Sequence, residues 1–328
     1  MSDRDASGPR LGPGGIDVTR PNVARVYDYF VGGKDHFAAD REFADQVLQV
    51  APKAPLGARV SREFLGRVVR FLVGQAGLTQ LIDIGSGLPT AGNVSEVAHA
   101  LDKDIRVVHV DNDPVVYTHS QALLSDRLTT DIILADVRDP AAILSDPVVS
   151  RLIDFDRPVG LLLLAVLHHV QDDDKPGAIM DTLRAAMPAG SYLAISSFRL
   201  PGPETGLREI TIENEKVFSG GLGSGRWRAE SEIQAWFGDW DLLEPGLVPL
   251  LEWRPPVDGV RVERDEIYHS FWGGVARKGS ALSRALSRGP YHGAHARFDP
   301  NVRDAGGGGR PRALGNRRDH GSAPGVRA

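Results

Sequence analysis

The stretch DIGSGLPT, residues 83–90, decides the fold, because it places two glycines directly after the short apolar run 80–84. Glycines between a strand and a helix let the backbone approach a ligand closely, and open α/β sheets bind ligands in that crevice. A dinucleotide fingerprint would have glycine at position 90, where this chain has threonine. The carboxylate of Asp83 repels a pyrophosphate but suits an ammonium or sulfonium group. The stretch therefore favours a cofactor site, with tight packing of the turn as the alternative.

Outward from this turn, short apolar runs alternate with helical segments, which is typical of a parallel sheet covered on both faces. The pattern predicts an α/β fold. The predicted strands are residues 80–84, 106–110, 131–134, 159–167 and 192–197, and the predicted helices between them are residues 91–101, 114–124, 141–153 and 175–187.

Further elements flank this alternating region. Upstream, the spacing of apolar residues predicts helices over 21–30, 39–50 and 58–75. Downstream, a Pro- and Gly-rich bridge precedes a predicted helix over 229–237 and two last strands, 247–253 and 268–277. The linker between these strands is too short for a typical crossover helix, so they are expected to pair antiparallel at the sheet edge.

The charge is divided unevenly along the chain. Of a net charge of −5, the last 48 residues carry +6, from nine arginines and three aspartates, which leaves −11 on the first 280 residues. The acidic charge of the first 280 residues disfavours a nucleic-acid partner. The arginine-rich tail keeps such a partner as an alternative. Residues 1–15 and 279–328 are rich in Gly and Arg or Pro and are expected to be disordered.

Several classes of protein are disfavoured by composition. No apolar run is long enough to span a bilayer, and the first fifteen residues lack the apolar segment of a secretory signal. The chain has no cysteine, which excludes disulfides and thiolate metal sites. We therefore expect a cytoplasmic protein that does not associate with a membrane.

Acidic residues follow the next two predicted strands. Asp111 and Asn112 lie at the end of the second strand, and Asp136 closes the third. Acids at these positions can accept hydrogen bonds from ribose hydroxyls and from an adenine amino group. Each could instead be a turn or capping residue, as Asp113 before Pro114 is at a helix start. Together with Asp83 they indicate a cofactor that contains a nucleoside.

Four segments resemble a known family: TRPNVARVYDYFVGGKDHFAADREFA, DIGSGLPTAGNVSEVA, VDNDPVV and DFDRPVGLLLLAVLHHV. Over about residues 16–278 the chain resembles an actinobacterial S-adenosyl methyltransferase family of largely undefined substrates, within the class I S-adenosylmethionine-dependent methyltransferases. The resemblance implies a seven-stranded Rossmann-like sheet with a C-terminal antiparallel hairpin. We expect the chain to divide into a helical lid at 16–60 and a methyltransferase domain at 61–278, with an acceptor-side insertion at 198–245.

The resemblance implies S-adenosyl-L-methionine as the cofactor. The residues of the glycine turn would hold its methionine moiety, Asp111 its ribose, and Asp136 with Val137 its adenine. Pro89 stands where the usual turn has a third glycine. The candidate cofactor-binding residues after the strands are Asp83, Gly85, Ser86, Gly87, Asp111, Asn112, Asp136, Val137 and Ala165.

The segment YDYFVGGKDHF, residues 27–37, is expected to form part of the lid. Tyr29, Gly32 and Lys34 are expected to bind the cofactor. Lys34 would contact the methionine carboxylate, and an aromatic residue of the segment would close off the methyl group. The alternative, in which the tyrosines pack as core and Lys34 is solvated, stays open.

Two histidines follow the fourth strand and are candidate general bases. Either His168 or His169 could take a proton from a nucleophile, and the sequence does not rank them. The run 172–174 of three aspartates is typical of a solvated helix start, so no metal is expected. Trp227 and the loop 220–227 are expected to border the acceptor pocket.

These observations predict transfer of a methyl group to an oxygen, nitrogen or carbon of a small molecule. One alternative is a protein that binds the cofactor without catalysis, as a sensor or assembly partner. A second alternative, a nucleotide-dependent oxidoreductase, is disfavoured by Asp83 and by the missing glycine.

Overall fold

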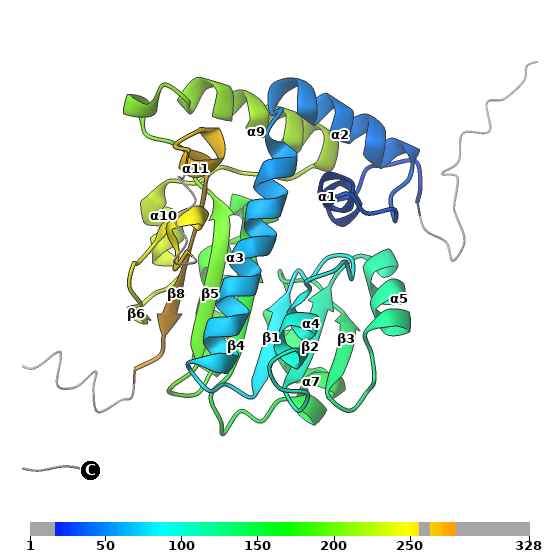
Figure 1. The fold of residues 1–328 in the computed structure, drawn as a ribbon, viewed down its shortest axis with the longest axis vertical. Helices are drawn as coiled ribbons and strands as arrows, with labels where there is room; N and C mark the ends of the chain where they lie inside the picture. The colour runs from blue at the N-terminus through cyan, green and yellow to red at the C-terminus, as the bar shows by residue number, and fades with distance from the viewer. Residues whose placement is uncertain (1–16, 256–262, 280–328) are drawn as a thin grey trace, which may run out of the picture. The chain divides into compact units, whose positions relative to one another are not determined.

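A mostly parallel β-sheet runs through the computed structural model, which describes residues 17–255 and 263–279 (Figure 1). The strands lie in the order β3-β2-β1-β4-β5-β8-β6, and β7 also pairs with β8. Strands β1 to β5 pair in parallel, whereas β8 runs antiparallel to β5. The bounds are β1 Gln80–Ile84, β2 Arg106–Asp111, β3 Thr130–Leu134, β4 Gly160–Leu164, β5 Tyr192–Phe198, β6 Asp241–Leu242, β7 Val248–Pro249 and β8 Phe271–Arg277.

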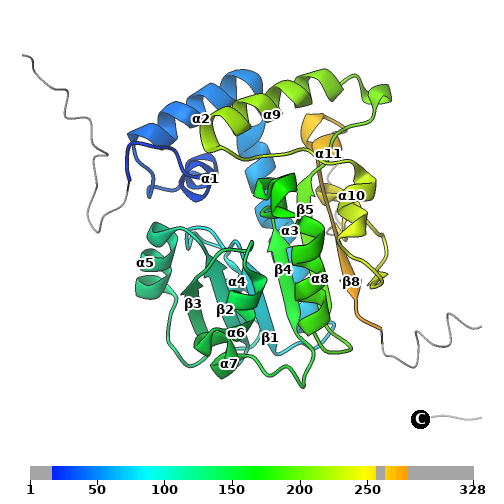
Figure 2. The ribbon, with the colours of Figure 1, turned by 180° about the vertical axis from the view of Figure 1, so that it is seen from behind.

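Helices cover both faces of the sheet (Figures 1 and 2). In β4, Leu161 and Leu163 join one apolar cluster, whereas Leu162 and Leu164 join the other. Successive side chains of a strand point to opposite faces, so a strand buried on both faces needs an unbroken apolar run. One face is packed by α3 (Ala54–Gly74) and α4 (Val94–His99), and the other by α6 (Pro140–Ser145), α7 (Pro147–Leu152), α8 (Pro176–Ala186) and α10 (Glu230–Ala235).

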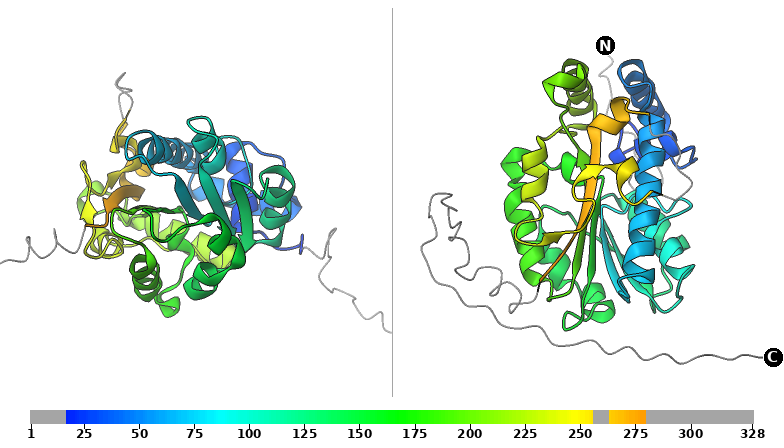
Figure 3. Two further views of the ribbon diagram at one scale, coloured as in Figure 1. Left: turned by 90° about the horizontal axis from the view of Figure 1, so that it is seen from below. Right: turned by 60° about the vertical axis from the view of Figure 1, so that its left-hand side comes forward.

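A helical cap lies beyond the C-terminal ends of the parallel strands (Figures 1 and 3). We define the cap as α1 (Val23–Val31), α2 (Ala38–Val50) and α9 (Arg208–Leu222), which share an apolar cluster of their own. The short helix α11 (Glu266–Ser270) lies beside it, and α5 (Pro114–Leu123) packs on β3. The cap therefore joins the first two helices of the described chain to a helix that follows β5.

The sheet confirms the predicted α/β class and the five predicted parallel strands to within a few residues. The antiparallel edge is also present, but it is built from two short strands instead of one. The predicted strand 247–253 contributes only Val248–Pro249 and then continues as a 3₁₀ helix, Leu250–Glu252. Pro249 has no N–H to extend the ladder. With β6 also paired to β8, the described sheet has eight strands, where the family resemblance implied seven.

Other boundaries differ from the sequence prediction. The 15-residue helix α9 occupies part of the region expected to be a Pro- and Gly-rich bridge. The helix predicted over 141–153 is two helices, because Asp146 caps a new start before Pro147. The predicted boundary at residue 60 falls inside α3, so lid and domain share that helix. Residues 1–15 and nearly all of the predicted tail lie outside the described residues.

Among the described helices, none is both long and apolar enough to cross a membrane.

Candidate functional site

A cavity of about 470 Å³ lies between the ends of β1 to β4 and the helical cap. The sheet order reverses between β1 and β4, and at such a point open α/β sheets bind ligands. The structure thus brings together every candidate residue that follows a strand. The lining includes Asp83, Gly85, Ser86, Gly87, Asp111, Asn112, Asp136, Val137, Ala165, His168 and His169.

The backbone of the glycine turn is held in the left-handed region. Gly85 has φ +74° and Gly87 has φ +66°. A Cβ on Gly85 would lie 2.6 Å from Cγ2 of Val166, whereas a Cβ on Gly87 would meet nothing within 4 Å. Gly85 is therefore required by close packing, and Gly87 leaves open space beside its backbone. Ala165 also has a positive φ, +58°, and its N–H donates to Ser196 Oγ at 2.9 Å.

Asp83 is buried beneath this turn and has a protein partner. Its Oδ2 lies 3.0 Å from Nδ1 of His109, and Nε2 of His109 lies 3.1 Å from Ser95 Oγ. His109 is the register partner of Asp83 on β2. The pair holds the Asp83 carboxylate in place, a role that the sequence did not indicate because His109 lies within an apolar strand.

Asp111 is buried at the end of β2 and faces the glycine turn. Its Oδ2 accepts the N–H of Gly87 at 2.9 Å, and its Oδ1 accepts the N–H of Asp113 at 3.0 Å. Burial raises the pKa of Asp111 to about 6, although these two backbone bonds oppose the rise. A buried carboxylate at this position is suited to accept further hydrogen bonds from a ligand.

Asp136 lies beyond β3 in a different electrostatic setting. Arg138 donates to its Oδ1 from both the backbone N–H and Nε, each at 2.9 Å, and Asn112 donates to its Oδ2 at 3.0 Å. The Arg138 guanidinium lowers the pKa of Asp136 to about 2. Asp136 is therefore held as a carboxylate, and Asn112 links the ends of β2 and β3.

The three lid residues predicted to bind cofactor lie outside the cavity lining. Tyr29 donates from its hydroxyl to Asp45 on α2 at 3.1 Å, Gly32 ends α1 with φ +82°, and Lys34 is exposed. The other face of α1 lines the cavity, with Tyr27 and Asp28 among its residues. Residues two apart on a helix point in different directions, and the sequence did not show which face would turn inward.

Two unpredicted residues give the cavity polar groups without a full set of partners. Asp28 is 1% exposed, and its Oδ1 accepts no hydrogen bond from the described chain. The guanidinium of Arg62 on α3 donates to Thr90 Oγ1 at 2.6 Å and forms no ion pair within residues 17–255 and 263–279. Ser86 Oγ in the glycine turn is likewise buried and unpartnered there.

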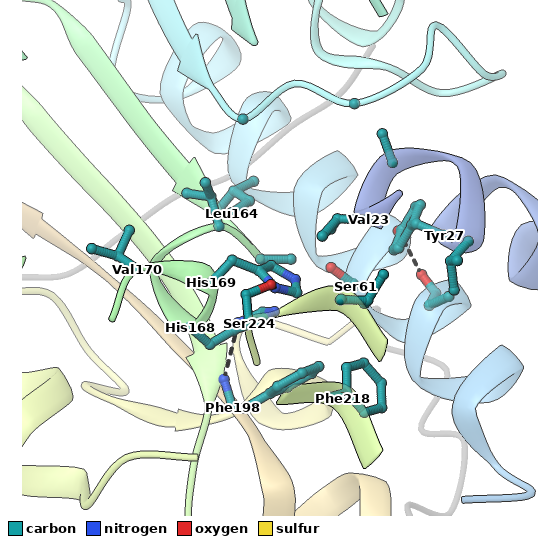
Figure 4. A pocket seen from close by; sticks show the side chains of 18 of the residues that line it. Val23, Tyr27, Ser61, Leu164, His168, His169, Val170, Phe198, Phe218 and Ser224 are labelled. Atoms are coloured by element: carbon teal, nitrogen blue, oxygen red, sulfur yellow. Dashed lines mark hydrogen bonds between the residues drawn. The ribbon is translucent and has the colours of Figure 1, made fainter. Parts of the chain in front are cut away.

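The structure distinguishes the two histidines (Figure 4). His168 is 2% exposed and stacks on Phe198, with ring centroids 3.7 Å apart. His169 is half-buried, and its Nδ1 lies 2.9 Å from Ser224 Oγ. Burial lowers the pKa of both rings, to about 4 for His169, so both are neutral at pH 7.

No cluster of metal-ligating side chains occurs in the described part of the chain. In the predicted solvated run, Asp172 pairs with Arg228 at 2.6 Å and with Arg226 at 3.0 Å. These ion pairs join the segment after β4 to the loop after α9, which includes Trp227. Trp227 lines the cavity, and its place beside the acceptor stays a prediction.

The sequence analysis missed the α9 and α11 side chains that line the same cavity. They include Asn214, Phe218, Glu266 and Ser270. The only signal for them in the sequence was helical spacing, because Asn214 and Phe218 lie one turn apart, as do Glu266 and Ser270.

Comparisons with known proteins identify the family of the chain. A family described as S-adenosyl methyltransferase matches residues 11–279. A crystal structure of a putative methyltransferase from Thermobifida fusca is 40% identical, with a TM-score of 0.77, and the match covers 83% of this chain and 100% of that one. A DUF574 family protein from Streptomyces avermitilis is 36% identical, with a TM-score of 0.73, and the match covers 80% of this chain and 99% of that one. No curated protein matches. The chain belongs to the S-adenosyl methyltransferase family and is an S-adenosylmethionine-dependent methyltransferase of Rossmann-like fold.

Proposed function

We propose that this enzyme methylates an oxygen, nitrogen or carbon nucleophile of a small molecule enclosed under the cap, with His169 as the general base. The observation that carries the proposal is one cavity lined by both the strand-end acids and the histidines. Its volume, about 470 Å³, lies within the usual range for small-molecule sites. The acidic body of the chain gives no support for a nucleic-acid acceptor.

The residues present fit the cofactor. Gly87 offers open space beside its backbone, and Ser86 Oγ and Asp28 Oδ1 are buried polar atoms without described partners. Asp111 would accept the ribose hydroxyls, Asp136 with Val137 would hold the adenine, and Arg62 would pair with the methionine carboxylate. When bound, S-adenosylmethionine supplies an electrophilic methyl group on a sulfonium centre.

The hydrogen bond of His169 supports this role. When Nδ1–H donates to Ser224 Oγ, Nε2 is the nitrogen with a free lone pair. Nε2 takes the proton that an O–H or N–H nucleophile loses as it accepts the methyl group, and then returns that proton to solvent. His168, stacked on Phe198, forms the wall against which the acceptor lies. Positioning of the nucleophile supplies the rest of the rate enhancement.

The experiment that tests the cofactor part is a calorimetric titration of the whole chain with S-adenosylmethionine, S-adenosylhomocysteine and NAD. We expect the first two to bind with micromolar affinity, about −8 kcal/mol, and NAD not to bind. The acceptor part is tested with labelled cofactor. Transfer of the labelled methyl group is measured to a mixture of small molecules and, separately, to RNA and protein extracted from cells. Label found only in RNA or protein would contradict the proposal.

Replacing Arg62 with methionine should weaken S-adenosylmethionine binding by about tenfold or more, because a charge-assisted hydrogen bond is lost. Decarboxylated S-adenosylmethionine lacks the carboxylate, so its affinity should be the same for both proteins. Arg70→Met is the matched control, since Arg70 is exposed on the same helix. An equal loss for both cofactors would remove Arg62 from the carboxylate site.

A further inference from the structure

The acceptor end of the cavity has a wall of stacked aromatic rings. The Phe198 ring lies between two others: its centroid is 3.7 Å from that of His168 and 4.3 Å from that of Trp227, at interplanar angles of 17° and 15°. Phe218 and Phe271 contact Phe198 edge-on, at 5.9 and 5.2 Å. Figure 4 shows Phe198 and Phe218 on the same side of the pocket as the histidines. Because His168 and Trp227 cover the two faces of Phe198, a flat ligand ring would pack against ring edges of this wall, in an edge-to-face arrangement.

A polar group follows this wall along α9. Asn214 lies one turn before Phe218, is 3% exposed, and lines the cavity. Its Nδ2 donates to Glu266 Oε1 at 3.0 Å, which leaves its Oδ1 buried without a partner in the described chain. Ser270, one turn after Glu266, is 8% exposed and has an equally unpartnered Oγ. A buried acceptor without a donor is costly, so these atoms favour a ligand that donates hydrogen bonds.

The charge at this end of the cavity is negative. Glu266 is half-buried, and no ion pair to it occurs among residues 17–255 and 263–279. The nearby cation, Lys53, is bound to Asp265 at 2.8 Å. Burial raises the pKa of Glu266, although the hydrogen bond from Asn214 and the charge of Lys53 oppose the rise. A ligand cation would supply a counter-ion to this carboxylate.

We propose that the methyl acceptor is a small aromatic molecule that carries an amine, with its ring on the Phe198 wall and its ammonium group at Glu266 and Asn214. This inference rests on the function proposed above. A protonated amine has no lone pair to attack a methyl group. The nucleophile is therefore a second group of the acceptor, at the other end of the ring beside His169.

The test compares binding of four probes to protein saturated with S-adenosylhomocysteine. Tyramine, 4-ethylphenol and 3-(4-hydroxyphenyl)propionate share a phenol ring but carry a cationic, neutral or anionic end, and tryptamine adds a larger ring with an amine. We expect at least one amine to bind about tenfold or more tightly than 4-ethylphenol, and the propionate to bind most weakly. Calorimetry measures the affinities.

Glu266→Gln should abolish the preference for the amine and leave the affinity for 4-ethylphenol unchanged. Asn214→Ala should also weaken binding of the amine. It tests the same site through a second side chain, so the test does not depend on the folding of Glu266→Gln alone. The matched control is Glu263→Gln, an exposed glutamate outside the cavity lining that should keep the full preference.

Three binding results with the probes would overturn the inference. They are equal binding of the three phenols, a preference that survives in Glu266→Gln, and failure of both amines to bind the loaded protein. A loss of S-adenosylhomocysteine affinity in Glu266→Gln would also overturn it, because Glu266 would then belong to the cofactor site. Failure of wild-type protein to bind S-adenosylhomocysteine would instead contradict the proposed function.

Discussion

Replacing His169 with glutamine lowers kcat for an acceptor with an O–H or N–H nucleophile by about 10²–10⁴-fold, the usual contribution of a general base. The amide keeps a polar group at this position but cannot take a proton. Binding of S-adenosylhomocysteine should stay within about twofold of wild type, because the change affects only the reaction step. Steady-state kinetics with labelled cofactor and calorimetry measure the two quantities. An unchanged kcat would remove the base role.

The pH profile separates a base from a structural residue. Burial lowers the pKa of His169 to about 4, so the ring is neutral, and able to accept a proton, at any pH well above 4. The acidic limb of kcat/KM that depends on His169 is therefore expected near pH 4, below the ordinary histidine value of about 6.5, and it should be absent from the residual rate of His169→Gln. Ser224→Ala tests the positioning of the ring, and we expect a smaller fall in kcat with a shifted acidic limb.

His168→Gln is the matched comparison for this assignment. His168 is almost fully buried and stacks on Phe198, so its loss should lower the melting temperature and the acceptor affinity more than kcat. Equal losses of kcat in both variants would mean that the two rings act together, which their centroid separation of 4.5 Å permits.

The sequence predicted most of the sheet and the strand-end half of the site. A strand buried on both faces leaves a continuous apolar run, as in β4, and the residue after such a run must lie at the C-terminal edge. Asp111 and Asp136 could therefore be placed without knowledge of side-chain contacts. The partner of Asp83 could not, because the Asp83 and His109 pair depends on the register between two strands.

The cap half of the site was less accessible to sequence reasoning. The orientation of α1 decides whether Tyr27 or Tyr29 faces the cofactor, and both faces of that helix carry aromatic residues. Helix α9 was missed because isoleucine and threonine at its start, and two glycines near its end, weaken its helical signal. Asn214 and Glu266 come together only in the folded chain, since 51 residues separate them in sequence.

Replacing Asp111 with asparagine weakens S-adenosylhomocysteine binding about 10- to 100-fold at pH 8, since hydrogen bonds from two ribose hydroxyls to a charged acceptor are lost. The wild-type affinity should also depend on pH. In the free protein the pKa of Asp111 is about 6, because burial outweighs the two backbone donors. Two further donors from ribose stabilise the carboxylate and lower its pKa in the complex. Below pH 6 binding must then release a proton, so the affinity falls as the pH falls, by up to about tenfold per pH unit.

Calorimetry between pH 5 and 8 measures this dependence in wild type and variant. Asp111→Asn has no proton to release at this position, so its affinity should lose that dependence on pH. Asp136→Asn is the control: Arg138 lowers the pKa of Asp136 to about 2, so that carboxyl is ionised across the whole range. Its replacement should weaken binding and keep the wild-type slope below pH 6. If the pH dependence survives in Asp111→Asn, the released proton belongs to another buried acid. Asp28 is the first to test, because burial raises its pKa and its Oδ1 has no partner in the described chain.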